Sequence, residues 1–273
     1  MRSCCLAVLV ALLSLAASVK GAPAPAPAAK GKPMAVSVLD RLRGQLDGPD
    51  DPSALQATKE LGNSGSPNAA KPLIATLTTG TTPARAQAAL AALGRLNAPR
   101  AVDVLVLYAG HRNNELRTQA CKALVGLNDK RATTTLLDRL GDAAPEVRAA
   151  AAEGLAARHE RQATPRLFLL VKRNDPGAAA PLGLLATPDL IPQLAELQGG
   201  IDDAVLASAL GEYLKRDDVA DKLRVEVVKT IGKISGAAAT TALIEYTAAV
   251  PAKEDRPSRR EAQKVIDERG NAR

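Results

Sequence analysis

The sequence predicts an all-α fold, a right-handed α-solenoid of about six to seven stacked helical hairpins. Two columns of identical residues carry this prediction. Steps of 32, 31 and 31 residues separate the leucines Leu73, Leu105, Leu136 and Leu167. Each arginine of the second column lies 12 residues after the leucine of its unit: Arg85, Arg117 and Arg148. A fixed period of this size is typical of arrays in which each unit packs on its neighbours.

Composition sets the first limits on function. The chain has 273 residues and a formal net charge of +7. Removal of a leader ending at Gly21 would leave 34 basic and 29 acidic residues, a net charge of +5. The basic residues are spread along the sequence, whereas nucleic-acid-binding proteins more often gather them on one face or tail. Aromatic residues are only 1% of the chain, which counts against single-strand binding by base stacking.

Residues 1–21 read as a signal peptide. A positive residue is followed by an apolar run, which is shorter than the roughly 20 residues that a membrane span needs. Cleavage fits either after the small residues at 16–18 or after those at 19–21, and an uncleaved amino-terminal anchor is the alternative. We expect a periplasmic or secreted bacterial protein with no transmembrane span after cleavage. The Pro/Ala-rich residues 22–35 then form a flexible linker.

The solenoid is expected over residues 36–250. It begins with a helix whose leucines share one face, Leu39, Leu42 and Leu46, and a second short helix over 54–61. First helices of the regular units are expected at 69–77, 101–109, 132–140, 163–171 and 186–194. The matching second helices are expected at 84–94, 115–125 and 146–156, and 222–232 resembles them.

The period breaks after Leu167. The next leucine of the column, Leu190, follows after only 23 residues, so the second helix at about 176–186 is short and carries no arginine. Both 202–214 and 219–234 look like second helices, and the sequence leaves their pairing open. The pattern of a first helix returns at 239–247. Residues 251–273 are expected to form a charged capping helix, opened by a capping box from Ser258 to Glu261.

Several helix starts carry a hydroxyl residue followed by proline. A Ser or Thr side chain can accept a hydrogen bond from the first turn, and proline fits the first helical position. The pattern predicts caps at four places, Ser66-Pro67, Thr82-Pro83, Thr164-Pro165 and Thr187-Pro188. Pro145 takes the same position in its own helix.

The repeated units resemble short bacterial HEAT repeats, the type that includes the phycobilisome-lyase-like repeats. The match rests on paired aliphatic residues in the first helix, an acidic or amide turn, and a second helix that opens with an aliphatic residue, Arg and Ala. Asp142 and the run Val147-Arg148-Ala149-Ala150 are its clearest instance. The resemblance covers about residues 36–250. It implies that second helices line the concave side and that a first helix can be kinked, as expected at Pro192.

The arginine column allows two interpretations. Arg85, Arg117 and Arg148 could bind phosphates or an acidic partner on the surface. The resemblance implies instead that they tie neighbouring units together through turn carboxylates and carbonyl oxygens. The five donors of a guanidinium suit such ties, and we favour this structural role.

No pattern of catalytic or metal-binding residues is present in the sequence. His111 and His159 lie far apart and have no cysteine or carboxylate at the spacing of metal ligands. After leader cleavage only Cys121 remains, and its apolar neighbours favour a buried core thiol. We therefore expect no enzymatic activity and no cofactor.

The function that follows is a protein–protein interaction scaffold of the bacterial cell envelope. Solvent-facing residues of the second helices are the candidate partner-binding surface: Gln87, Gln119, Lys122, Glu153 and Arg158. Tyr108, Tyr213 and Tyr246 are either binding hot spots or core residues. One alternative is a nucleic-acid-binding protein related to HEAT-like DNA glycosylases. A second is a chromophore lyase or its accessory, which the export signal opposes.

Overall fold

The computed structural model describes residues 32–250 and 255–271. The predicted signal peptide, its cleavage position and most of the Pro/Ala linker lie outside these residues. No helix within the described ranges is both long and apolar enough to cross a membrane.

All regular secondary structure of the described residues is helical, and these residues contain no strand. The α-helices are α1 (Val36–Asp47), α2 (Asp51–Asn63), α3 (Ala70–Thr79), α4 (Pro83–Leu96), α5 (Val102–Ala109), α6 (Asn114–Leu124), α7 (Lys130–Arg139), α8 (Pro145–Ala157), α9 (Thr164–Lys172), α10 (Ala179–Leu185), α11 (Leu190–Ala195), α12 (Asp203–Leu214), α13 (Asp221–Lys233), α14 (Ala237–Ala249) and α15 (Pro257–Asn271). Short 3-10 turns, η1 (Pro99–Ala101), η2 (Arg161–Ala163) and η3 (Pro176–Ala178), precede α5, α9 and α10.

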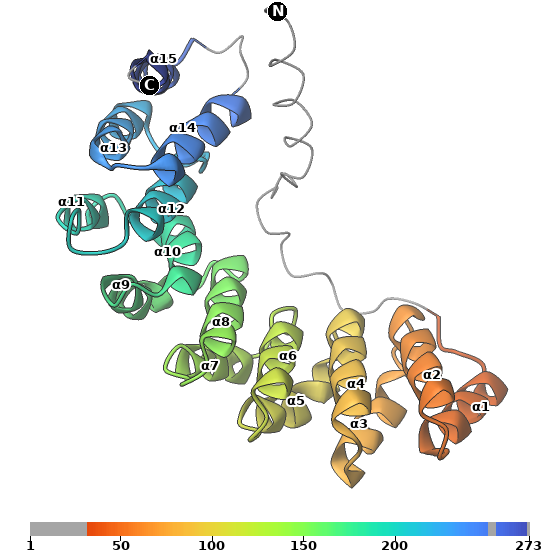
Figure 1. Ribbon diagram of the computed structural model, residues 1–273. Helices are drawn as coiled ribbons and strands as arrows, with labels where there is room; N and C mark the ends of the chain where they lie inside the picture. Colours follow the sequence, from red (N-terminus) through yellow and green to blue (C-terminus); the bar gives the residue numbers. More distant parts are fainter. Residues whose placement is uncertain (1–31, 251–254, 272–273) are drawn as a thin grey trace, which may run out of the picture.

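The helices form two rows along one continuous arc (Figure 1). The even-numbered helices α2 to α14 follow the concave side, and each packs on the next even-numbered helix. The odd-numbered helices form the outer, convex row. Helices α1 to α14 therefore pair into seven hairpins, in agreement with the expected six to seven. Helix α15 packs on α13 and α14 and closes the end of the array.

The leucine column forms the centre of the core. Leu73, Leu105, Leu136 and Leu167 are each 0% exposed, on α3, α5, α7 and α9. The second helices contribute mainly alanine and leucine to the same continuous cluster. Because alanine side chains are short, the helix backbones can approach closely, and the array needs almost no aromatic residues to fill its interior.

Glycines permit the closest contacts in the inner row. A Cβ on Gly94 of α4 would lie 3.0 Å from the Cα of Ala123 in α6. A Cβ on Gly183 of α10 would lie only 2.2 Å from the carbonyl oxygen of Ala209 in α12. Any side chain at position 183 would push α10 and α12 apart. The spacing of the concave helices therefore depends on residues without a side chain.

The structure settles the pairing that the sequence left open and corrects the row to which two helices were assigned. Residues 202–214 form α12 in the inner row, as a second helix should. Helix α13, which covers 222–232, lies in the outer row against α15, although its sequence resembles second helices. Residues 239–247 were expected to form a first helix, but α14 packs on α12 in the inner row. The Ala-rich stretch of α14 suits that closely packed row.

Only one of the four expected hydroxyl caps forms. Thr82 accepts a hydrogen bond from the backbone N–H of Arg85. Thr164 is instead the first residue of α9, and its hydroxyl is buried without a hydrogen-bond partner among the described residues. Helix α3 begins at Ala70, four residues after Ser66, and α11 begins at Leu190, three residues after Thr187, so neither hydroxyl residue stands directly before its helix. The capping prediction fails there because short turns separate the hydroxyl from the helix.

Two further local predictions were wrong. Pro192 does not kink a helix, because α11 begins at Leu190 and places the proline in the first turn, where its missing N–H is not needed. Ser258 does not form a capping box with Glu261. Its backbone N–H and hydroxyl both bind the carboxylate of Asp221, and the hydroxyl also pairs with Tyr246.

Candidate functional site

The arginine column lies between the units. Arg117 donates from Nε and Nη2 to both carboxylate oxygens of Asp142 in the next hairpin, at 3.0 and 2.8 Å. Its Nη1 donates to the carbonyl oxygens of His111 and Arg112, in the turn of its own hairpin. Arg148 repeats the arrangement one unit later, with Asp175 ahead at 2.6 Å and the carbonyl of Asp142 behind at 2.9 Å. Arg117 and Arg148 therefore each bind two turns: the carboxylate of the next hairpin's turn and carbonyl oxygens of their own.

Arg85 bonds in the opposite direction. It binds the carboxylate of Asp51 and donates to the carbonyl oxygens of Leu46 and Gly48, all in the preceding hairpin. In the turn between α5 and α6, which follows Arg85, His111 stands at the repeat position that Asp142 occupies in the turn between α7 and α8. Because that turn offers no carboxylate ahead, Arg85 makes its contacts backwards.

The Asp142 carboxylate is held in its charged form. Burial alone would raise its pKa, since its side chain is only 5% exposed. Hydrogen bonds from Arg117 and from the backbone N–H of Ala144 outweigh burial, and the pKa lies below the ordinary value of 3.8. The ion pair between Asp142 and Arg117 therefore has a structural role: it links two neighbouring hairpins.

Arg158 is corrected from a surface candidate to a structural residue. Its side chain is 9% exposed, and Nη1 donates to the carbonyl oxygens of Val125 and Leu127 at the end of α6. Arg216 and Arg269 do the same for the ends of α10 and α13. These arginines satisfy carbonyl groups that a helix leaves unpaired at its C-terminus. These three arginines form a second column that the regular period does not predict, because their spacing departs from it.

The other candidate residues lie on the inner row and are free. Gln87, Lys122 and Glu153 are exposed, and Gln119 is half-buried. None of the four forms a hydrogen bond or ion pair with another described residue. They lie on the consecutive inner helices α4, α6 and α8. These side chains can bind an external molecule without giving up an internal contact.

Further along the concave side, one lysine joins two inner helices. Lys215 at the end of α12 forms ion pairs with Glu212 of its own helix and with Glu245 of α14, the latter at 3.2 Å. The pKa of Lys215 is raised: burial lowers it, but the two glutamates outweigh burial. A hollow of about 240 Å³ lies between α12 and α14, floored by small residues such as Gly211 and Ala242. The i,i+3 spacing of Glu212 and Lys215 is the sequence signal for the ion pair between these two residues.

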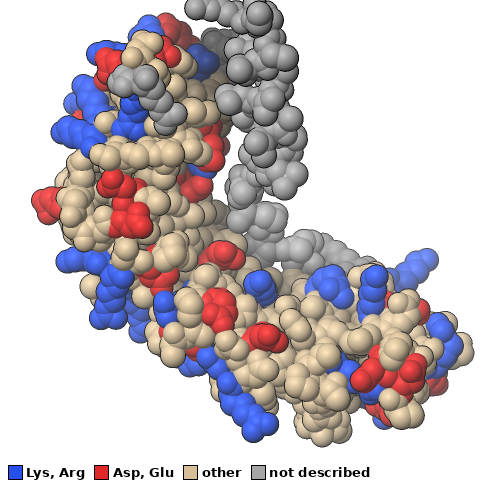
Figure 2. Space-filling view, in the orientation of Figure 1, with Lys and Arg blue, Asp and Glu red and all other residues tan. Residues whose placement is uncertain are grey.

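Charge is distributed unevenly between the rows. Figure 2 shows Lys and Arg gathered along the convex outline, over α7, α9 and α13. The exposed basic residues there are Lys130, Arg131, Arg166, Lys172, Lys222, Lys229 and Lys233. On the inner helices α6, α8 and α14 the exposed charged residues are mainly acidic: Glu115, Lys122, Glu146, Glu153 and Glu245. The sequence alone showed scattered charge because the two rows alternate along the chain.

The three tyrosines are core residues and not surface hot spots. Tyr108, Tyr213 and Tyr246 are 9%, 0% and 1% exposed. The Tyr108 hydroxyl donates to the carbonyl oxygen of Leu77 at 3.0 Å, in the preceding outer helix. The Tyr213 hydroxyl is buried and has no hydrogen-bond partner among the described residues. Large aromatic anchors are therefore absent from the described part of the concave surface.

The described residues hold no group of three or more metal-ligating side chains. Cys121 is fully buried, and burial raises the pKa of its thiol to about 12, which keeps it in the unreactive protonated form. His111 stacks on the ring of Tyr108 with 5.5 Å between ring centroids. His159 is exposed at a left-handed backbone position.

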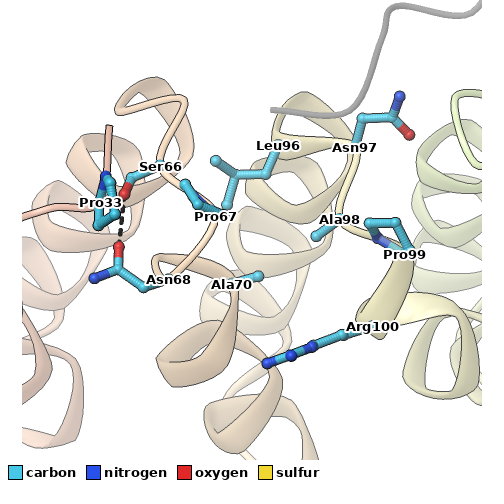
Figure 3. Close-up of a pocket in the computed structure, with 10 residues that line it drawn as sticks. All are labelled: Pro33, Ser66, Pro67, Asn68, Ala70, Leu96, Asn97, Ala98, Pro99 and Arg100. Atoms are coloured by element: carbon cyan, nitrogen blue, oxygen red, sulfur yellow. Dashed lines mark hydrogen bonds between the residues drawn. The ribbon is translucent and has the colours of Figure 1, made fainter. Parts of the chain in front are cut away.

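A pocket of about 420 Å³ lies where the chain enters the solenoid, between the α2–α3 and α4–η1 turns (Figure 3). Its walls are mainly apolar and include Pro33, Pro67 and Pro99. Two of its polar residues are already engaged, because Ser66 and Asn68 bond to each other and to the backbone of Met34. Ser66 and Asn68 thus fix the incoming chain at Met34, beside the pocket.

The match to known sequence families decides the identity of the fold. The model of HEAT repeats matches residues 39–124, 70–156 and 107–180, which together span more than half of the chain. The chain belongs to the HEAT-repeat family. The matched residues include all three arginines of the column, Arg85, Arg117 and Arg148. No curated protein matches this HEAT-repeat chain in sequence.

The chain is also similar to solved structures, at low identity. The chain is similar to the complex of CpcE and CpcF of phycocyanin lyase from a Nostoc species, with 21% identity, 89% of this chain and 97% of that chain covered, and a TM-score of 0.48. It is also similar to a designed armadillo repeat protein in complex with the peptide (KR)4, with 16% identity, 84% and 98% covered, and a TM-score of 0.38.

Proposed function

We propose that this HEAT-repeat protein is a non-enzymatic scaffold of the bacterial cell envelope that binds a protein partner along its concave row. The observation that carries the proposal is the contrast between two sets of polar residues. The column arginines are consumed by contacts between units. Gln87, Lys122 and Glu153 are exposed on successive inner helices and are bonded to no other described residue.

The shape of the inner row favours an extended partner. A solenoid buries its core between neighbouring units and leaves a long curved surface uncovered. Between the candidate residues this surface carries small side chains, among them Ala84, Ala88 and Ala91 of α4, which are exposed or half-buried. Since the tyrosines are in the core, large anchoring side chains must come from the partner. We expect the partner to place aromatic or long side chains across the concave helices.

The envelope location rests on the sequence of residues 1–21, whose short positive start and apolar run suit an export signal. Fractionation of cells that express the full chain, followed by amino-terminal sequencing, tests it. Recovery of a shortened protein from the envelope or medium supports export. Recovery of the intact chain from the cytoplasm contradicts it.

Partner binding is tested by affinity purification of the tagged full chain. We compare the wild type with a variant in which Gln87, Lys122 and Glu153 are replaced by alanine, and with a control in which the outer-row residues Lys130 and Arg131 are replaced. The proposal expects the same partner with the wild type and the outer control, and its loss with the inner variant.

The other two functions give different results in the same preparation. Tight binding to duplex DNA that falls steeply with salt would favour the nucleic-acid alternative. Binding of a bilin on mixing would favour the chromophore-lyase alternative. Either result, together with unchanged partner recovery from the inner variant, would contradict the scaffold.

A further inference from the structure

A second surface feature lies on the outer row, where the repeat is shortened. The Leu167-to-Leu190 step is 23 residues, against 31 in the regular units. The inner helices of this region stay tightly packed through Gly183 and Ala209. The outer helix α11 has only six residues, Leu190–Ala195. A helix this short leaves part of α9 uncovered, and a groove of about 540 Å³ lies between the two helices.

The groove is apolar and open. Pro165, Phe168, Leu169 and Leu190 line it. Phe168 is the one phenylalanine of the chain and is half-buried, while Leu169 is 54% exposed. Exposed large apolar side chains are few among the described residues, and a phenylalanine beside one of them marks an unusual patch.

The repeat itself provides a comparison for Leu169. Leu107 of α5 and Asp138 of α7 occupy the same position two units and one unit earlier, each two residues after the column leucine. Leu107 is 69% exposed, so it matches Leu169 in type and exposure. It lines none of the pockets described above. Leu169 differs from it in standing next to a groove.

Basic residues flank the groove on its α9 side. The Arg161 side chain is 66% exposed and lines the groove, and its closest carboxylate, Asp218, is 3.8 Å away. Lys172 lies over the Phe168 ring, with Nζ 5.9 Å from the centroid. Arg173 follows Leu169 by four residues, on the same side of α9. Asp189 is the one carboxylate in the lining.

A buried polar atom also lies in the wall. Thr164 lines the groove, and its Oγ1 is buried without a hydrogen-bond partner among the described residues. An unpaired buried hydroxyl is costly, and native structures hold few. Because this oxygen is buried, a bound segment could pair with it only if the start of α9 shifted to uncover it.

We propose that this groove binds a segment of a second protein that presents a large apolar side chain flanked by carboxylates. The apolar side chain packs against Phe168 and Leu169. The carboxylates lie along the α9 side, near Arg161 and Lys172. The charge of that side selects an acidic segment over a basic one. This binding site is separate from the concave row, so neither proposal depends on the other.

The test uses two fluorescein-labelled peptides and fluorescence anisotropy with the full chain. One peptide has the sequence Glu-Glu-Phe-Leu-Glu-Glu, and the other has lysine in place of every glutamate. We expect the acidic peptide to bind in the micromolar range and the basic peptide at least about tenfold more weakly. Leu169→Glu should weaken acidic-peptide binding at least about tenfold, whereas the matched control Leu107→Glu should leave it unchanged.

Two charge variants give opposite predictions. Arg161→Gln should weaken binding of the acidic peptide, and Asp189→Asn should strengthen it, because it removes the carboxylate of the lining. Variants of Gln87 and Lys122 should have no effect, which separates this site from the concave row. Circular dichroism of each variant checks that it retains the helical fold.

Three results would overturn the proposal. The first is equal binding of the acidic and basic peptides, or binding of neither. The second is an equal loss with Leu169→Glu and Leu107→Glu, which would show that the groove plays no part. The third is recruitment to phosphatidylglycerol vesicles that both leucine variants reduce, without peptide binding, since this would mean that the outer row adsorbs to anionic lipid.

Discussion

Arg117 of one hairpin donates hydrogen bonds to both carboxylate oxygens of Asp142 in the next hairpin, at 3.0 Å from Nε and 2.8 Å from Nη2. The carbonyl oxygen of Asp142 in turn accepts a hydrogen bond from Arg148, which holds Asp175 one unit further on. Asp142 and Arg148, which belong to one hairpin, thus together connect three consecutive units. The charge is largely shielded from water, since the Asp142 side chain is 5% exposed.

Asp142→Asn is expected to destabilise the protein by about 2–3 kcal/mol, because it leaves the guanidinium of Arg117 without a compensating charge in a mostly buried position. The matched control is Asp51→Asn. Asp51 pairs with Arg85 in the same column, but its side chain is 59% exposed, and its loss should cost less than about 1 kcal/mol. Urea unfolding of both variants measures the difference. Equal losses would mean that burial of the pair does not matter.

The same residue makes stability depend on acid. The pKa of Asp142 is lower in the folded protein than its ordinary value of 3.8, so its contribution is complete above about pH 5. It is lost as the pH falls through the folded-state pKa, because the protonated carboxyl no longer pairs with Arg117. The free energy of unfolding should differ between wild type and Asp142→Asn by about 2–3 kcal/mol above pH 5. This difference should narrow as the pH falls from 5 to 3. A gap that stays constant over this range would contradict the assignment.

The sequence was a good guide to the repeat. The leucine period predicted the buried centre, and Leu73, Leu105, Leu136 and Leu167 are each fully buried. Spacing alone was sufficient there because burial recurs with every unit. The spacing could not predict that Arg85 binds Asp51 of the preceding hairpin. That difference depends on His111, which stands at the repeat position of Asp142 and offers no carboxylate.

Sequence patterns failed where two helix rows use similar residues. Helix α13 has the aliphatic-Arg pattern of a second helix, yet it lies in the outer row. Its Arg224 is buried and donates to carbonyl oxygens of Leu214 and Arg216. Arg158 looked like a surface residue because charge usually indicates exposure. Its position beside the end of α6 is a tertiary feature that no local pattern records.

The tyrosines predict opposite effects of one change. Tyr213→Phe should stabilise the protein by about 1 kcal/mol, because it removes a buried hydroxyl that has no partner among the described residues. Tyr108→Phe should destabilise it by about 1 kcal/mol, because it breaks the bond to the Leu77 carbonyl. Thermal unfolding of the two variants measures the sign. Destabilisation by Tyr213→Phe would show that its hydroxyl has a partner.

Close packing of the inner row predicts a large effect at Gly183. Gly183→Ala should destabilise the protein by about 1–3 kcal/mol, since the new Cβ would lie 2.2 Å from the Ala209 carbonyl oxygen and force α10 and α12 apart. Gly44→Ala in α1 is the control. Apart from the backbone of its own helix, no atom lies within 4 Å of its added Cβ, and alanine should stabilise that helix by up to about 1 kcal/mol. Tolerance of Gly183→Ala would contradict the close approach.

We propose that the concave row binds a protein in the cell envelope. Photo-crosslinking in cells tests it most directly, with a photoreactive residue placed in turn at Lys122 and Glu153 on the inner row and at Leu107 on the outer row. All three side chains are exposed, so reactivity alone does not separate them. We predict that both inner positions crosslink to the same envelope protein and that position 107 does not. Crosslinks from position 107 alone, or inner-row crosslinks only to nucleic acid or to no partner, would contradict the claim.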